Sequence, residues 1–212
     1  MPVSLYQMPQ IFISHTDRTR LFVWHIIEDV ATLKSLLPVE KTLEVEKMAS
    51  IVHQKQFLAK QILLHRYGLT DKITYLPSGK PVCEDNNYIS ISHSGEYVAV
   101  AFSQEPAGVD IERKNPKLQK ISSRFQHPDD ILPDMDDKLK QWQFLWTAKE
   151  SVYKLAGISG LSFKQDIRIT AFDKKNLSAT ALLKNKRLID LYFYLLKPDY
   201  VLCTGFYGND KI

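Results

Sequence analysis

Two stretches of the sequence repeat apolar residues at helical spacing, and short runs typical of β-strands border each of them. Residues 41–67 make up the first stretch, and Gly68 supplies its C-terminal cap. Residues 136–156 make up the second, which carries Trp142 and Trp146 on a buried stripe and ends at Gly157. A further helical segment, 28–37, is stopped by proline. Strands are predicted at residues 20–27, 88–92, 97–102, 108–112, 167–172, 179–183, 188–196 and 200–206.

The order of these segments is strand, helix, strands, then helix and strands again, and it predicts an α+β fold. A chain of 212 residues has room for one domain or for two of roughly 100 residues each. The pattern divides near residues 104–116, so we expect an N-terminal half, 1–104, and a C-terminal half, 105–212. The Asp-rich segment 127–138 contains two prolines and is predicted to be an exposed loop before the second long helix.

Composition excludes several classes of protein. With 28 Lys and Arg against 24 Asp and Glu, the formal net charge of +4 lacks the basic footprint of a dedicated nucleic-acid binder. Cys83 and Cys203 lie 120 positions apart, which fits neither a zinc site nor a disulfide scaffold and indicates free thiols in a reducing cytoplasm. No apolar run approaches the roughly 20 residues of a membrane helix. The first ten residues lack the pattern of a signal peptide, so we expect a cytoplasmic protein.

Two carboxylates stand two positions apart in the apolar segment AGVDIE. Because side chains alternate across a strand, Asp110 and Glu112 point to the same face. On a solvated face such a pair is unremarkable. The alternative is that adjacent like charges need a cation, and paired hard oxygen ligands suit Mg²⁺.

The second long helix contains the segment WTAKESVYKLAG. Glu150 and Lys154 are four residues apart and share one helix face, where an ordinary ion pair contributes only about 0.2–0.5 kcal/mol. The tryptophans of this helix indicate burial, however, and buried charges usually have a partner or a task. Glu150 is then a candidate third oxygen ligand, and Lys149 and Lys154 are candidates to neutralise a phosphate.

Two turns complete the set of candidate features. In ISISHSGEYVAVAF, His93 stands between Ser92 and Ser94 just before a predicted turn, which is a common surface position but also a suitable phosphate cradle. The segment SGKP by itself indicates only a turn. Triad spacing, glycine-rich nucleotide loops and CxxC pairs are all absent from the sequence. The residues therefore point to magnesium-assisted chemistry or binding on a phosphorylated small molecule.

The motifs SGKP, ISHSGEYVAVAF, GVDIE and WTAKESVYKLAG, in this order, resemble those of the 4′-phosphopantetheinyl transferases of the Sfp type. They span residues 78–157, more than a third of the chain. The resemblance implies an enzyme that moves the phosphopantetheine arm of coenzyme A to a serine hydroxyl of an apo acyl- or peptidyl-carrier protein and releases 3′,5′-ADP. It also implies a pseudo-dimer of two similar α+β halves with the active site in the cleft between them.

The resemblance assigns roles to individual positions. It implies Mg²⁺ bound by Asp110, Glu112 and Glu150, and a serine-activating base that is either Glu150 or Asp130, with Glu150 preferred. The implied coenzyme A contacts are Lys149 and Lys154 at the diphosphate, Ser92 and His93 at the 3′-phosphate, and Gly79, Lys80 and Pro81 at the adenine end. Lys154 would also assist catalysis.

The first long helix departs from the family pattern. Relatives carry arginines there that reach the 3′-phosphate, whereas this sequence has Lys55 and Lys60, which supply charge without a bidentate fork. Lys55 is the candidate contact. Two other functions are compatible with the residues: a non-catalytic module that binds coenzyme A or a carrier protein, and a magnesium-dependent hydrolase of a phosphorylated metabolite. The mild positive charge suits an acidic carrier protein, and we expect a monomer.

Overall fold

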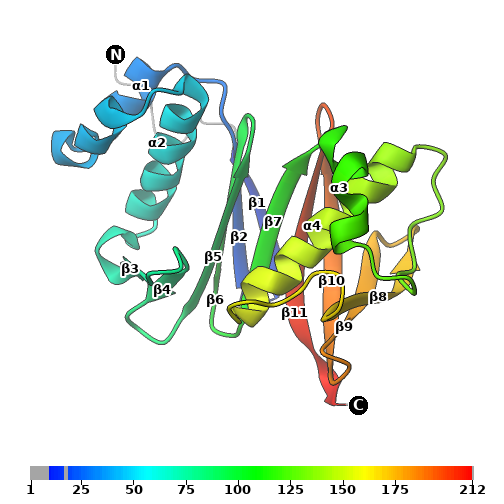
Figure 1. The fold of residues 1–212 in the computed structure, drawn as a ribbon. Helices are drawn as coiled ribbons and strands as arrows, with labels where there is room; N and C mark the ends of the chain where they lie inside the picture. The colour runs from blue at the N-terminus through cyan, green and yellow to red at the C-terminus, as the bar shows by residue number, and fades with distance from the viewer. Residues whose placement is uncertain (1–9, 17–18, 212) are drawn as a thin grey trace.

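A computed structural model describes residues 10–16 and 19–211 of the chain (Figure 1). Residues 1–9, over which the sequence predicts no signal peptide, lie outside the described residues. Helices and strands both make up large parts of the fold, so the predicted α+β class is confirmed. In the described part of the chain, no helix is long and apolar enough to cross a bilayer. Both cysteines are free thiols, and Cys203 is buried.

The first sheet is antiparallel and has the strand order β1-β2-β6-β5. Helix α2 packs against it through Leu58, Ile62 and Leu63, which meet Trp24 and Val100 of the sheet in one apolar core. A small hairpin, β3-β4, follows α2. The elements of this part are β1 (Gln10–Thr16), β2 (Thr19–His25), α1 (Val30–Ser35), α2 (Ile51–Arg66), β3 (Ile73–Tyr75), β4 (Pro81–Cys83), β5 (Tyr88–Ser94) and β6 (Tyr97–Ser103).

The second sheet is also antiparallel, with the order β7-β11-β10-β9-β8. Helix α4 covers one of its faces and contributes Phe144, Val152 and Leu155 to a second apolar core. Figure 1 shows α3 beside α4 and α2 on the far side of the first sheet. The elements of this part are β7 (Ala107–Arg113), α3 (Lys117–Phe125), α4 (Lys138–Ala156), β8 (Ile167–Asp173), β9 (Ser178–Leu183), β10 (Arg187–Leu196) and β11 (Tyr200–Lys211).

The two sheets share a core order of elements. In the first, β2 precedes α2 and the hairpin β5-β6, and β2 pairs with β6; in the second, β7 precedes α4 and the hairpin β10-β11, and β7 pairs with β11. A third apolar cluster draws on both sheets and joins them, because Leu21, Val23 and Ala99 of the first contact Ile111 and Leu202 of the second. The burial of this apolar surface stabilises the contact between the sheets.

The structure corrects several sequence-based boundaries. Residues 41–67 are not one helix: two short 3₁₀ turns, Val39–Lys41 and Leu43–Lys47, precede α2. Helix α2 begins after Ser50, whose side chain accepts a hydrogen bond from the His53 amide and so supplies the N-cap. The sequence also failed to predict β1, β3, β4 and α3.

Candidate active site

Strands β5 and β7 are the facing edges of the two sheets, and serine hydroxyls link them. Ser90, Ser92 and Ser94 lie on one face of β5, and their Oγ atoms accept hydrogen bonds from the backbone amides of Val109, Ile111 and Arg113 at 3.0, 3.2 and 3.1 Å. The residue numbers of the bonded partners increase together along β5 and β7, so the two edge strands run parallel. We call this contact the serine seam.

Asp110 lies on β7 at the serine seam, with 3% of its surface exposed. Its Oδ1 accepts hydrogen bonds from Ser92 Oγ at 2.8 Å and from Lys154 Nζ at 2.7 Å. Its Oδ2 is buried and has no hydrogen-bond partner among the described residues. Since a buried polar atom without a partner is costly, this oxygen is suited to receive a ligand.

Glu112 and Glu150 carry shifted pKa values. Burial, together with the charges of Asp110 and Glu150, raises the pKa of Glu112 to about 7, although its Oε1 accepts a hydrogen bond from Trp146 Nε1 at 3.1 Å. Burial and the charge of Asp110 likewise raise the pKa of Glu150 to about 7. The charge of Asp110 thus opposes the ionisation of both glutamates, which is the situation that a bound cation relieves.

The chemistry of this donor set fits a hard divalent cation. Carboxylate oxygens are the ligands that Mg²⁺ prefers, and the free Asp110 Oδ2 is available to it. In the described residues, however, no three His, Cys, Asp or Glu side chains form a ready-made metal cluster. The predicted ligands therefore face a common region without being gathered around one point.

Helix α4 brings Glu150 and Lys154 to the site but turns Lys149 away from it. Lys154 pairs with Asp110 rather than with Glu150 in the described part of the chain. Lys149 is fully buried and pairs with Asp130, whose side chain is also fully buried, at 2.7 Å. It further donates to the carbonyl oxygens of Phe163 and Ile167.

The predicted roles of Lys149 and Asp130 are therefore wrong. Lys149 cannot reach a diphosphate, because its ammonium group is enclosed by Asp130 and two carbonyl oxygens. Asp130 cannot act as a base on an incoming hydroxyl, because its oxygens accept hydrogen bonds from the amides of His127 and Ile169 as well as from Lys149. The pair holds the segment after α3 against β8. The exposed loop predicted at 127–138 is thus anchored by a buried residue.

Ser92 and His93 lie on opposite faces of β5. The predicted contact of Ser92 with a phosphate is corrected, because the side chain is 6% exposed and its hydroxyl is used by Asp110 and Ile111. His93 faces α2, on the side of the strand away from the serine seam. Partial burial, followed by the positive charges of Lys154, Lys60 and His53, lowers the pKa of His93. Because Lys60 and His53 of α2 act on His93, we call these three residues the cationic cluster.

Lys60, rather than Lys55, belongs to this cationic cluster. Its Nζ lies 3.3 Å from the Tyr75 hydroxyl and 4.9 Å from the centre of the Phe57 ring, which holds the side chain in place. Lys55 instead acts on Asp29, whose pKa is lowered mainly by hydrogen bonding from Thr32 and to a smaller degree by the charge of Lys55. Helical spacing explains the difference. Lys60 lies seven positions after His53, so both residues are on nearly the same face of α2, whereas Lys55 lies two positions after His53 and is rotated by about 200° about the helix axis.

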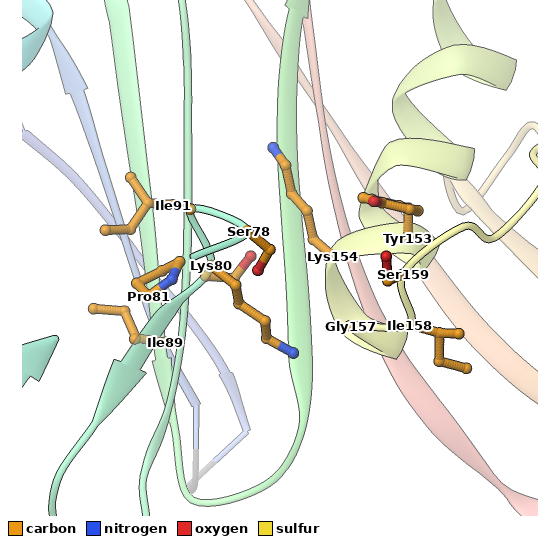
Figure 2. Close-up of a pocket in the computed structure, with 12 residues that line it drawn as sticks. Ser78, Lys80, Pro81, Ile89, Ile91, Tyr153, Lys154, Gly157, Ile158 and Ser159 are labelled. Carbon is orange, nitrogen blue, oxygen red and sulfur yellow. The ribbon is translucent and has the colours of Figure 1, made fainter. Parts of the chain in front are cut away.

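The SGKP turn lies across from the C-terminal end of α4 (Figure 2). Gly79, Lys80 and Pro81 line a pocket of about 240 Å³ together with Tyr153 and Lys154 of α4. Lys80 extends toward Gly157, where an added Cβ would lie 2.0 Å from its Nζ. A second pocket, of about 520 Å³, shares Lys80, Pro81 and Lys154 with the first. The SGKP turn thus shares its pockets with Lys154, the lysine that pairs with Asp110.

Comparison with known proteins gives a consistent picture. Residues 106–205 match the family model of the 4′-phosphopantetheinyl transferase superfamily. The chain is 37% identical to the 4′-phosphopantetheinyl transferase Sfp of Bacillus subtilis strain 168 over 94 residues, which is 42% of each protein. It is 30% identical to the transferase ffp of Bacillus subtilis over 66% of this chain and 68% of that protein. It is 27% identical to the transferase psf-1 of Bacillus pumilus over 84% of this chain and 82% of that protein.

The alignment to the first of these relatives thus spans less than half of that protein, while the other two alignments cover about two thirds or more. The region matched by the family model contains Asp110, Glu112, Glu150 and Lys154. The order of sequence motifs, the α+β architecture and these similarities agree, and the chain belongs to the 4′-phosphopantetheinyl transferase superfamily, with relatives of the Sfp type.

Proposed function

We propose that the chain transfers the 4′-phosphopantetheine arm of coenzyme A to a serine hydroxyl of an apo acyl- or peptidyl-carrier protein, with Mg²⁺, and releases 3′,5′-ADP. The observation that carries the proposal is that Asp110, Glu112 and Glu150 face a common region, in which Lys154 binds Asp110. Transfer from a diphosphate needs positive charge next to the phosphate oxygens. This region offers the ammonium group of Lys154 and carboxylate oxygens that can hold a cation.

Mg²⁺ would be held by Asp110, Glu112 and Glu150, whose unfavourable proximity it offsets. When bound, the metal supplies positive charge that neutralises a diphosphate and stabilises a departing phosphate group. The chain's own Lys154 is 27% exposed at its side chain and lines the pocket next to the carboxylates. It is placed to bind a phosphate oxygen from the pocket side and to stabilise charge on the leaving group.

Glu150 is the proposed base for the incoming serine hydroxyl. The charge of Asp110 acts on Glu150, so this carboxylate borders the proposed metal site, where an incoming hydroxyl must meet the diphosphate. Asp130, the other candidate from the sequence, is enclosed by its own partners. Glu150 therefore takes this role alone.

The cationic cluster of His93, Lys60 and His53 is the proposed site for the 3′-phosphate of coenzyme A. The charges of Lys60 and His53 from α2 act on His93 of β5, and Lys154 adds its charge. The pocket beside Gly79, Lys80 and Pro81 is the proposed place for the adenine end. Lysine ammonium groups stand here in place of the bidentate arginine side chains that the family pattern has. The affinity of this site for a phosphate therefore depends on the number of contacts rather than on bidentate geometry.

The shared core order of the two sheets supports a pseudo-dimer with halves at residues 1–104 and 105–212. In this proposal the active site lies between the halves, the protein acts as a cytoplasmic monomer, and an acidic carrier protein docks against a chain of net charge +4.

Incubation of the protein with coenzyme A, Mg²⁺ and an apo carrier protein tests the function, with mass spectrometry of the carrier as the readout. A gain of one phosphopantetheine mass supports the proposal. Coenzyme A binding without transfer to any of several apo carriers would instead indicate a non-catalytic binding module. Release of phosphate in the absence of a carrier would indicate a hydrolase.

A further inference from the structure

The serine seam stands in place of a backbone ladder where β5 of the first sheet meets β7 of the second. An edge strand exposes unpaired amides, and three amides of β7 find acceptors in the hydroxyls of Ser90, Ser92 and Ser94. A hydroxyl accepts such a bond and still has one proton to donate. What each serine does with that proton distinguishes the three positions.

Ser92 donates its proton to Asp110 Oδ1 at 2.8 Å. The ammonium group of Lys154 binds the same oxygen at 2.7 Å. Two donors on one oxygen fix the rotation of the carboxylate and leave Oδ2 as the buried oxygen without a partner among the described residues. Without the hydroxyl, rotation about the Cβ–Cγ bond would allow Lys154 to share both oxygens.

We propose that Ser92 is a positioning residue that fixes the Asp110 carboxylate so that Oδ2 is presented to a divalent cation. This inference rests on the proposed magnesium-dependent function. Partners that orient a metal-binding carboxylate typically contribute about 10- to 100-fold to metal affinity. Ser92 comes from the first sheet and Asp110 from the second, so the orientation of this ligand depends on the contact between the sheets.

Ser90 provides a matched control on the same strand. It is as buried as Ser92, at 5% against 6% exposure, and it accepts the same type of bond, from the Val109 amide at 3.0 Å. In the described structure, no carboxylate accepts its proton. Ser90→Ala therefore removes one seam contact and leaves Asp110 untouched, whereas Ser92→Ala removes a seam contact and the orienting donor.

The first test measures binding of Mg²⁺ alone to the full chain by calorimetry. We expect Ser92→Ala to weaken binding about 10-fold, in line with other orienting partners, whereas Ser90→Ala binds as the unchanged protein does. Ser92→Thr keeps the hydroxyl and is expected to recover most of the affinity. Equal Mg²⁺ affinity in Ser90→Ala and Ser92→Ala would overturn the inference.

A second test needs no metal and separates this inference from the proposed function. A double-mutant cycle with Ser92→Ala and Asp110→Ala, measured by denaturant unfolding without divalent ions, should show at least about a twofold coupling in the unfolding equilibrium constant. The cycle with Ser90→Ala and Asp110→Ala should show none. If the unchanged protein binds no Mg²⁺, the metal-dependent function fails while this cycle still decides whether Ser92 holds Asp110. No coupling in the Ser92 cycle refutes the positioning role.

Discussion

Replacement of Gly108 by alanine tests how closely α4 is pressed against β7. The added Cβ would lie 2.0 Å from the carbonyl oxygen of Ser151 and 2.8 Å from the amide nitrogen of Leu155. Ordinary contact begins near 3.4 Å, so the helix would have to move by about 1.4 Å. The obstacle is the backbone of α4, which cannot rotate aside as a side chain can.

The cost follows from this displacement. Overpacking that forces backbone shifts costs about 1–3 kcal/mol, and a backbone obstacle places Gly108→Ala at the upper end. Alanine restricts the unfolded chain more than glycine does, which offsets about 0.5–1 kcal/mol. The expected net loss is about 2–2.5 kcal/mol, or about 4–10 °C in Tm for a chain of this size. The same movement would separate Lys154 from Asp110 and lower activity by more than the loss of folded protein explains.

Gly205 supplies the control, because it lies opposite Gly108 in the register of β7 and β11. An added Cβ there would meet the flexible Cδ2 of Leu191 at 3.1 Å, so we expect Gly205→Ala to cost less than about 1 kcal/mol. Urea unfolding followed by circular dichroism measures both variants. An equal loss of unfolding free energy in Gly108→Ala and Gly205→Ala would refute the close packing of α4 against β7.

Four further predictions follow from individual groups. Asp110→Ala should abolish transfer to an apo carrier while the circular dichroism spectrum is retained, and turnover near that of the unchanged protein would contradict its role. Lys60→Ala should weaken binding of coenzyme A but not of 3′-dephospho-coenzyme A, and Lys55→Ala should change neither, as calorimetry can show. Asp130→Ala should cost about 3–5 kcal/mol of unfolding free energy, because it leaves a buried lysine charge uncompensated. Because the pKa of Glu150 is raised from 4.5 to about 7 in the folded state, the folded protein holds a proton that the unfolded chain has lost between these values. Without divalent ions, its contribution to unfolding free energy should therefore fall as pH rises from about 4.5 to about 7, and Glu150→Gln should flatten this slope in urea titrations.

The fold was predictable from sequence where elements carry strong periodic patterns. Helix α4 and β5 to β10 follow from apolar spacing and turn residues and appear with changes of one or two residues at their ends, whereas β11 continues five residues beyond its predicted end. The failure at the start of the first long helix has a physical cause. Residues 41–50 contain apolar side chains at near-helical spacing, but they form 3₁₀ turns because Ser50 caps a helix that starts only at Ile51. Spacing alone does not show where a cap interrupts a periodic run.

The site was predictable only in part, because sequence reveals which residues share an element but not which face packs inward. The alternation in β7 correctly places Asp110 and Glu112 on one side, and the effect of the Asp110 charge on the pKa of Glu112 agrees with it. On α4, Lys149 lies about 100° from Glu150, which is enough to turn it into the apolar core. Its partner Asp130 lies 19 positions earlier in the sequence, so no local pattern joins the two.

The same alternation that places carboxylates on β7 also explains why the site lies at the serine seam. Each serine that bonds an amide of β7 stands beside the side chain of the preceding residue, so Ser92 meets Asp110, and Ser94 meets Glu112 at 3.4 Å. A backbone ladder between β5 and β7 would have used these amides without donating a proton to either carboxylate. Hydroxyl-mediated pairing joins the sheets and orients two carboxylates through the same atoms. Loss of the contact between the sheets would therefore remove one donor from each carboxylate and leave Asp110 with Lys154 and Glu112 with Trp146, even though both carboxylates belong to the second sheet.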